Sequence, residues 1–181
     1  RSFLVNTYAP LYTTFFNGLG YEVVLPDKPS QEGIDQRNAA FCYPAELAHG
    51  FFRSLLDIHA LHAIFLPHSK TAPTLDPGSS EQSQVCPLVQ GETFYLRSTF
   101  KHELQKLRNA GTVVLTPLID LSTGLDGIAP PLLSAARELG VSKGEASRAL
   151  DQAIARQEAC FDHMKRLGRQ ALADLESEPD R

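Results

Sequence analysis

The sequence predicts an α/β protein: a three-layer sandwich in which helices cover both faces of a mainly parallel, Rossmann-like sheet, ending in a long C-terminal helix. Two observations predict this class. Short apolar runs rich in β-branched residues alternate with longer segments whose apolar residues recur at helical spacing. Such alternation is typical of parallel strands joined by helices. The chain has 181 residues, 43% of them hydrophobic, which suffices for a single α/β domain over residues 1–181 with a sizeable core.

The opening of the chain predicts a strand, a helix and a strand. Residues 2–5 are a short apolar run typical of a strand, and residues 11–19 carry apolar side chains at helical spacing. Gly20 follows at the position where a glycine ends a helix. Residues 21–25, partly β-branched, then predict the second strand. Because the chain begins in a strand-like run without an initiator Met, we expect it to be a fragment of a longer polypeptide.

The middle of the chain continues the alternation. A proline at residue 44 marks the start of a predicted helix over residues 43–59, and residues 63–66 predict the third strand. Residues 68–85 contain no aromatic side chain and several Pro, Gly and Ser residues, which predicts a long loop. Loops of this length are usually functional or disordered.

The second half of the chain predicts three helices and one strand. In chain order, they cover residues 92–107, 112–118, 132–139 and 142–177. The last helix begins at a capping box, in which Ser142 and Glu145 satisfy backbone donors of the first turn.

Charge, hydropathy and cysteine content exclude several classes of protein. The 17 basic and 21 acidic residues give a net charge of −4 without a basic cluster, so we expect no nucleic-acid binding. No apolar run approaches the roughly 18 residues of a membrane span, and the start lacks the apolar stretch of a signal peptide. Three cysteines, an odd number, argue against a disulfide framework. We therefore expect a cytoplasmic protein that does not bind membranes.

Three residues occupy positions where ligands collect in open parallel sheets, at the strand ends that lead into helix starts. Cys42 precedes a predicted helix whose first turn favours a thiolate, so it is suited to bind a metal or act as a nucleophile. His68 follows the third strand, and Cys86 ends the long loop. One face of the sheet could gather all three, although their long separations are equally compatible with two packed thiols and an exposed histidine.

The remaining candidates favour structural roles. Cys160 lies on the apolar stripe of the last helix and is expected in the core, while His49 is expected to make a local hydrogen bond. Asp120, Asp126 and Glu145 are possible acids, but the sequence gives them no partners. A glycine-rich phosphate loop, a His-Glu-x-x-His motif and a nucleophile elbow are absent.

Five segments together resemble the acyl-CoA dehydratase activase-related domain. In order, they are Asn6-Thr7-Tyr8, the run from Thr14 to Leu25, Cys42-Tyr43-Pro44-Ala45-Glu46-Leu47-Ala48-His49-Gly50, Ile64-Phe65-Leu66-Pro67 and Cys86-Pro87-Leu88-Val89-Gln90. They cover about the first half of the chain. The second half is similar mainly in its long helix rich in Ala, Gln and Phe.

This resemblance implies a function in electron transfer. Domains of the family follow ATPase modules of the activase type in one polypeptide, and they are similar to 2-hydroxyacyl-CoA dehydratase subunits, which hold a [4Fe–4S] cluster through cysteines at helix-start loops. The resemblance therefore implies that Cys42, Cys86 and His68 hold such a cluster, supporting ATP-coupled electron delivery for 2-hydroxyacyl-CoA dehydration. The implied partners are acyl-CoA and the activase ATPase modules of the same polypeptide, where ATP binds.

The sequence departs from the family pattern at three places. His68 stands where the family has its third cysteine, and imidazole can replace thiolate as an iron ligand. Glu46 stands where the family has Lys, and residues 70–84 are richer in Ser and Pro. Two alternatives stay open: a non-catalytic interaction domain that has lost the cluster, and a zinc or small-ligand site at the same strand ends.

Overall fold

The computed structural model describes residues 3–37, 42–73 and 83–177 and overturns the predicted sheet. The described residues are mostly helical (65%), with two very short two-stranded parallel sheets and a long C-terminal helix. The prediction of a three-layer sandwich around a Rossmann-like sheet is therefore wrong, although the predicted long C-terminal helix is confirmed.

The strands form a narrow two-stranded ribbon. β1 (Ala63–Phe65) pairs with β3 (Val113–Leu115), and β2 (His68–Ser69) pairs with β4 (Leu118–Ile119), both in parallel. Between the two ladders, the Leu66 N–H donates to the Leu115 carbonyl (2.9 Å). Pro117 has no N–H with which to continue the ladder, which interrupts the pairing.

Two of the four predicted strands do not form. Residues 2–5 were expected to be extended, but the chain is helical in α1 (Phe3–Thr7), directly before α2 (Ala9–Gly18). An apolar run of this length does not distinguish a strand from a buried helix. Residues 21–25 follow a positive-φ Gly20 (86°), which ends α2 as predicted, but within the described residues they join no sheet. Without these two strands the ribbon stays two strands wide.

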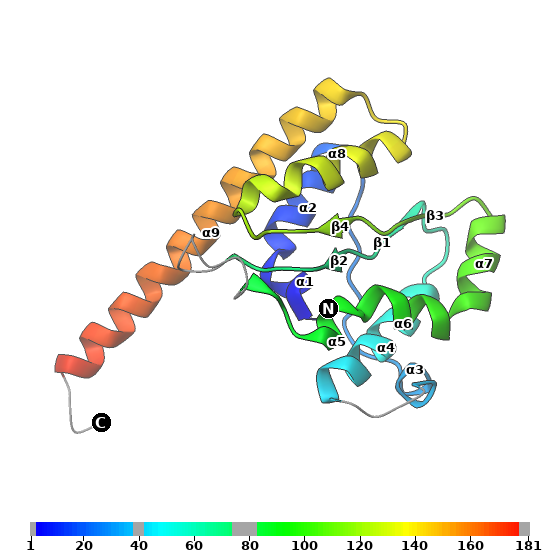
Figure 1. Cartoon of the computed structure of the whole chain (residues 1–181), viewed down its shortest axis with the longest axis horizontal. Helices are drawn as coiled ribbons and strands as arrows, with labels where there is room; N and C mark the ends of the chain where they lie inside the picture. The colour runs from blue at the N-terminus through cyan, green and yellow to red at the C-terminus, as the bar shows by residue number, and fades with distance from the viewer. Residues whose placement is uncertain (1–2, 38–41, 74–82, 178–181) are drawn as a thin grey trace.

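One group of helices packs on the face of the ribbon that carries Phe65 and Leu115. It comprises α2, the 3₁₀ helix η2 (Leu125–Ile128), α8 (Ala129–Glu138) and α9 (Lys143–Ser177). The Phe65 ring contacts Tyr12 and Phe16 of α2, with ring centroids 4.9 Å apart in each pair. Figure 1 shows these helices on one side of the ribbon.

The opposite face, which carries Ile64 and Leu66, is covered by α4 (Tyr43–Leu56), α6 (Glu92–Thr99) and α7 (Lys101–Asn109). Beside them, α3 (Gln31–Asp35) packs on α4, and α5 (Pro87–Gln90) contacts β2 and α6. The helix predicted over residues 43–59 is thus confirmed with an earlier end, and the one over 92–107 is divided at Phe100, which is fully buried.

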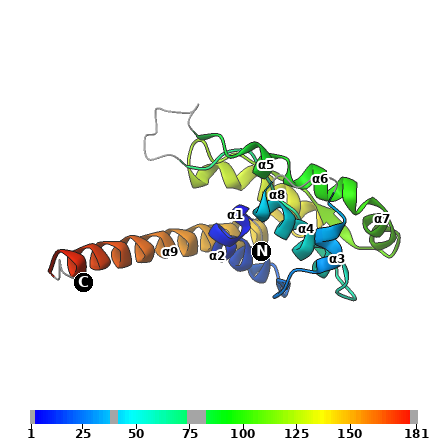
Figure 2. The ribbon, with the colours of Figure 1, turned by 90° about the horizontal axis from the view of Figure 1, so that it is seen from below.

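The helix α9 buries only its first half. Small side chains allow it to approach α2 closely, since a Cβ on Gly18 would lie 2.9 Å from the Ala149 Cβ. Further along, Gln157 is fully buried and accepts a hydrogen bond from the Leu11 N–H (3.2 Å) while donating to the Thr7 carbonyl (3.1 Å). Beyond Phe161 every described residue of α9 is exposed, and Figure 2 shows this half extending away from the other helices.

The predicted loop over residues 68–85 is partly ordered by the ribbon. His68 and Ser69 form β2, and Thr71 makes an isolated antiparallel bridge with Gln84. Residues 74–82 of the predicted loop lie outside the described residues. In the part of the chain that is described, no helix is both long and apolar enough to cross a membrane.

Candidate thiol site

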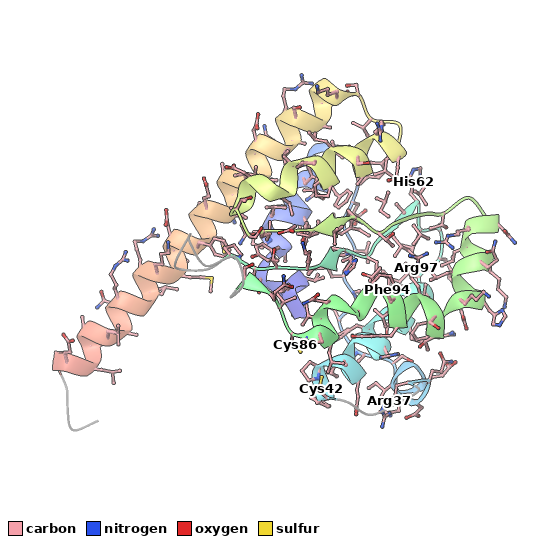
Figure 3. The ribbon with its side chains drawn as sticks, viewed as in Figure 1. Arg37, Cys42, His62, Cys86, Phe94 and Arg97 are labelled. Carbon is pink, nitrogen blue, oxygen red and sulfur yellow. The ribbon has the colours of Figure 1, made fainter. Side chains whose placement is uncertain are left out.

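Cys42 and Cys86 occupy equivalent positions at the starts of two helices. Cys42 is the N-cap of α4 and Cys86 the N-cap of α5, with extended ψ angles of 150° and 137°. A proline in the first turn of each helix fits there because that turn needs no N–H donor. Neither thiol is used in a capping hydrogen bond. Cys42 is half-buried and Cys86 exposed, and Figure 3 shows both at the same end of the molecule.

Both thiols lie near the hydroxyl of Tyr95 on α6. Burial raises the pKa of Tyr95 most, and the negative charges of Glu92, Cys42 and Cys86 raise it further. The Tyr95 hydroxyl is buried and has no hydrogen-bond partner among the described residues. A buried phenol normally finds a partner, so this hydroxyl is an available donor within electrostatic range of the two thiols.

The Tyr95 ring is held in place by His49. The two rings stack with centroids 5.0 Å apart and an interplanar angle of 10°. His49 is buried, and its Nδ1 lies 2.8 Å from the Ala45 carbonyl one turn earlier in α4. This is the local hydrogen bond expected for His49, and it fixes the surface on which Tyr95 packs.

His68 lies on a different side of α6. Its backbone N–H donates to the Pro117 carbonyl (2.8 Å), and its ring packs edge-on against Phe94, with centroids 4.9 Å apart. Phe94 and Tyr95 are consecutive in a helix and so point in different directions. Across residues 3–37, 42–73 and 83–177, no three His, Cys, Asp or Glu side chains are grouped to hold a metal ion. Two of the three predicted ligands thus lie near Tyr95, and the assignment of His68 as a ligand stays a prediction.

The charge introduced by Glu46 is compensated within the site. Its carboxylate lies 3.4 Å from the Arg37 Nε, and both side chains are largely shielded from solvent. Glu46 stands in the first turn of α4, where a carboxylate also complements the helix dipole. The negative charge near Cys42 is therefore paired with a guanidinium.

Comparison with known proteins identifies the family. The family model described as "CoA enzyme activase uncharacterised domain (DUF2229)" matches residues 1–181. The chain belongs to this family. Neither the curated proteins nor the solved structures include a match. The resemblance to activase-related domains is thereby confirmed over the whole chain, and it places this CoA enzyme activase domain in an activase context.

In this CoA enzyme activase domain, two of the acidic residues for which the sequence predicts no catalytic partner make hydrogen bonds. Asp120 accepts hydrogen bonds from Lys70 (2.8 Å), Thr71 (2.8 Å) and the Ser122 hydroxyl (2.7 Å). Glu145 bonds with Ser142 in the expected capping box. Both acids therefore have structural roles. Cys160, expected in the core, is only half-buried.

Sequence reasoning missed Tyr95 in this domain. The residue lies within a helix that the apolar periodicity predicts, and nothing in its spacing relates it to either cysteine. Its proximity to the thiols depends on how α4, α5 and α6 pack together. The one local signal is its polar hydroxyl on a helix that was expected to be amphipathic.

Proposed function

We propose that this CoA enzyme activase domain binds an iron–sulfur cluster through Cys42 and Cys86 and supports electron delivery for 2-hydroxyacyl-CoA dehydration. In this proposal the ATPase modules of a longer activase polypeptide supply the coupling to ATP hydrolysis. The observation that carries the proposal is the position of two thiols, from the starts of α4 and α5, beside one buried hydroxyl.

The ligand set present in the described residues fits only part of a cluster. A [4Fe–4S] cluster takes four ligands, usually thiolates, and the two cysteines supply two. We propose His68 as a further ligand, with the rest coming from a neighbouring module. When bound, the cluster would supply a strongly reducing electron, which is the chemistry that radical dehydration needs.

Other residues of this domain would support a bound iron–sulfur cluster. The Tyr95 hydroxyl is available to donate a hydrogen bond to a sulfur atom, and hydrogen bonds to sulfur are among the factors that set the potential of a cluster. Pairing of Arg37 with Glu46 keeps an uncompensated charge away from Cys42.

The test is anaerobic reconstitution with ferrous iron and sulfide. We expect the wild-type domain and the Cys160→Ser control to bind iron and sulfide equally, with visible charge-transfer absorbance and an EPR signal after reduction. Cys42→Ser and Cys86→Ser should each lose most of the bound iron, and His68→Ala should lose part of it. Equal iron contents in all four cysteine forms, or no bound cluster in the wild type, would contradict the proposal.

A second candidate function is an interaction domain without a cofactor. It is favoured by the lack, within the described residues, of a group of three possible metal ligands. The same reconstitution separates the two candidates, since an interaction domain would bind neither iron nor zinc at stoichiometric levels. A parallel titration with zinc alone distinguishes a zinc site, which would use the same cysteines but form no coloured cluster.

A further inference from the structure

An apolar cavity of about 500 Å³ lies beside β1, away from the two thiols. It sits at the level of the ribbon, between the helix layers on its two faces. Its walls include Tyr12 and Phe16 from α2, and Phe52 and Leu55 from α4. Residues 21–26 also line it. The volume is within the usual range of ligand sites.

One edge of β1 faces this cavity with free backbone groups. The hydrogen bonds to the segment that contains β3 and β4 involve the alternate residues His62, Leu66 and His68. The His62 carbonyl accepts from the Val113 N–H, and the N–H groups of Leu66 and His68 donate to the carbonyls of Leu115 and Pro117. In a parallel ladder the intervening residues direct their N–H and C=O groups to the opposite edge. Those residues are Ala63 and Phe65, and both line the cavity.

The outward groups of Ala63 and Phe65 are not used within the described part of the chain. No hydrogen bond joins them to residues 21–26, although these also line the cavity. Pro67, the next residue in the same alternation, has no N–H to place at this edge. Val24 and Leu25, which are among the lining residues, remain 46% and 37% exposed. The strand edge is therefore open to a further partner.

We propose that this cavity binds an extended, apolar peptide segment of a partner protein, which adds to the free edge of β1 as a third strand. A hydrocarbon ligand would match the walls but leave the outward N–H and C=O groups buried without partners, at about 1–3 kcal/mol each. A peptide supplies both a donor and an acceptor to that edge. A charged ligand would lose much of its hydration among walls that are mainly aromatic and aliphatic, and an anion would also meet Glu22 and Glu92.

The position of the cavity also determines which kinds of side chain the bound peptide segment must have. Because helices flank the site on both faces, successive side chains of the added strand would meet α2 and α4 in turn. Strands covered on both faces are apolar at consecutive positions rather than at alternate ones. The partner segment is thus a run of about five β-branched residues of which at least the central ones are apolar.

The proposal is tested with a synthetic peptide, acetyl-Thr-Val-Ile-Val-Thr-amide, titrated into the wild-type domain by calorimetry. We expect saturable binding, and at least tenfold weaker binding of a peptide with the same side chains whose alternate amides are N-methylated. This comparison leaves the protein unchanged. Amide hydrogen exchange should show new protection at Ala63 and Phe65 when the parent peptide is bound.

Two variants of the protein test the same edge of β1. Ala63→Pro removes an outward N–H at the first residue of β1, where proline is tolerated, and should weaken peptide binding. Leu172→Ala, on the exposed half of α9, should leave the affinity unchanged. No saturable peptide binding, equal binding of the two peptides, or binding of lauric acid in place of the peptide would overturn the proposal. These outcomes do not depend on whether the thiols bind iron.

Discussion

At the scale of single residues, Asp120 organises the end of the ribbon. Its carboxylate accepts hydrogen bonds from Lys70, Thr71 and both the hydroxyl and the backbone N–H of Ser122. The Thr71 hydroxyl in turn accepts from the Leu121 N–H (2.6 Å). One carboxylate thus connects the segment after β2 with the turn after β4. Hydrogen bonds from Lys70, then Ser122 and Thr71, hold the pKa of Asp120 well below its ordinary value.

We expect Asp120→Asn to lower the free energy of unfolding at pH 7 by about 1–2 kcal/mol, because the hydrogen bonds lose their charge and solvent already screens the ion pair. Since the folded pKa lies below the unfolded one, the stabilisation is complete above the unfolded value, about 3.9. It is lost as the pH falls through the folded value. Urea denaturation of both forms between pH 7 and pH 2 measures this difference.

The matched control is Asp126→Asn, which changes an exposed carboxylate on η2. This variant should change the stability by less than about 0.5 kcal/mol at any of these pH values. A stability difference between wild type and Asp120→Asn that stays constant down to pH 2 would show that the carboxylate charge has no role.

At the scale of elements, α3 crosses α4 at two glycines. A Cβ on Gly33 would lie 2.4 Å from the Arg53 Cβ and 2.7 Å from the His49 carbonyl oxygen, and Gly50 is similarly crowded by Pro29. We expect Gly33→Ala to force the two helices apart and to lower the free energy of unfolding by about 1–3 kcal/mol. Chemical denaturation followed by circular dichroism measures the change.

Gly168→Ala is the corresponding control in an exposed helix. No heavy atom lies within 4 Å of the Cβ it would add, so the substitution should stabilise α9 by about 0.5–1 kcal/mol through its helix propensity. Similar losses of stability in both alanine variants would mean that contact between α3 and α4 does not explain the effect at Gly33.

The elements also show what local sequence signals determine. Helix starts were predictable because their signals are local: Ser142 and Glu145 cap α9, and Pro44 begins α4. For the same reason, Cys42 was correctly expected at the start of a helix, whereas Cys86 was expected only at the end of a loop and α5 was not predicted. The strands were not, because pairing depends on distant partners: β1 finds β3, whereas residues 21–25 find none among the described residues. The position of Tyr95 beside the thiols required the same tertiary information.

At the scale of the whole molecule, the two halves of α9 differ in what supports them. The first half packs on α2 and α8, and it ends with the buried Gln157 amide and the Phe161 ring, which lies edge-on to Tyr8. The second half carries exposed apolar side chains at Met164, Leu167, Leu172 and Leu175. Among the described residues, only contacts within α9 support it, such as the hydrogen bond from Gln170 to Asp174 (2.7 Å).

This division predicts the outcome of truncation. Removing residues 164–181 should change the free energy of unfolding by less than about 0.5 kcal/mol, because the described part of that segment packs against no other element. The helical circular dichroism signal should fall, since a projecting helix of this length contributes signal without tertiary support. Urea denaturation of the full-length and shortened proteins tests both expectations.

A second truncation that also removes residues 157–163 should behave differently. It leaves the Leu11 N–H and the Thr7 carbonyl without the Gln157 amide and exposes the Tyr8 ring, so we expect a loss of at least about 1–3 kcal/mol. If the shorter deletion alone destabilises the domain to this extent, the second half of α9 must contact the folded core in solution. If neither deletion does, the buried amide does not hold the start of α2 against α9.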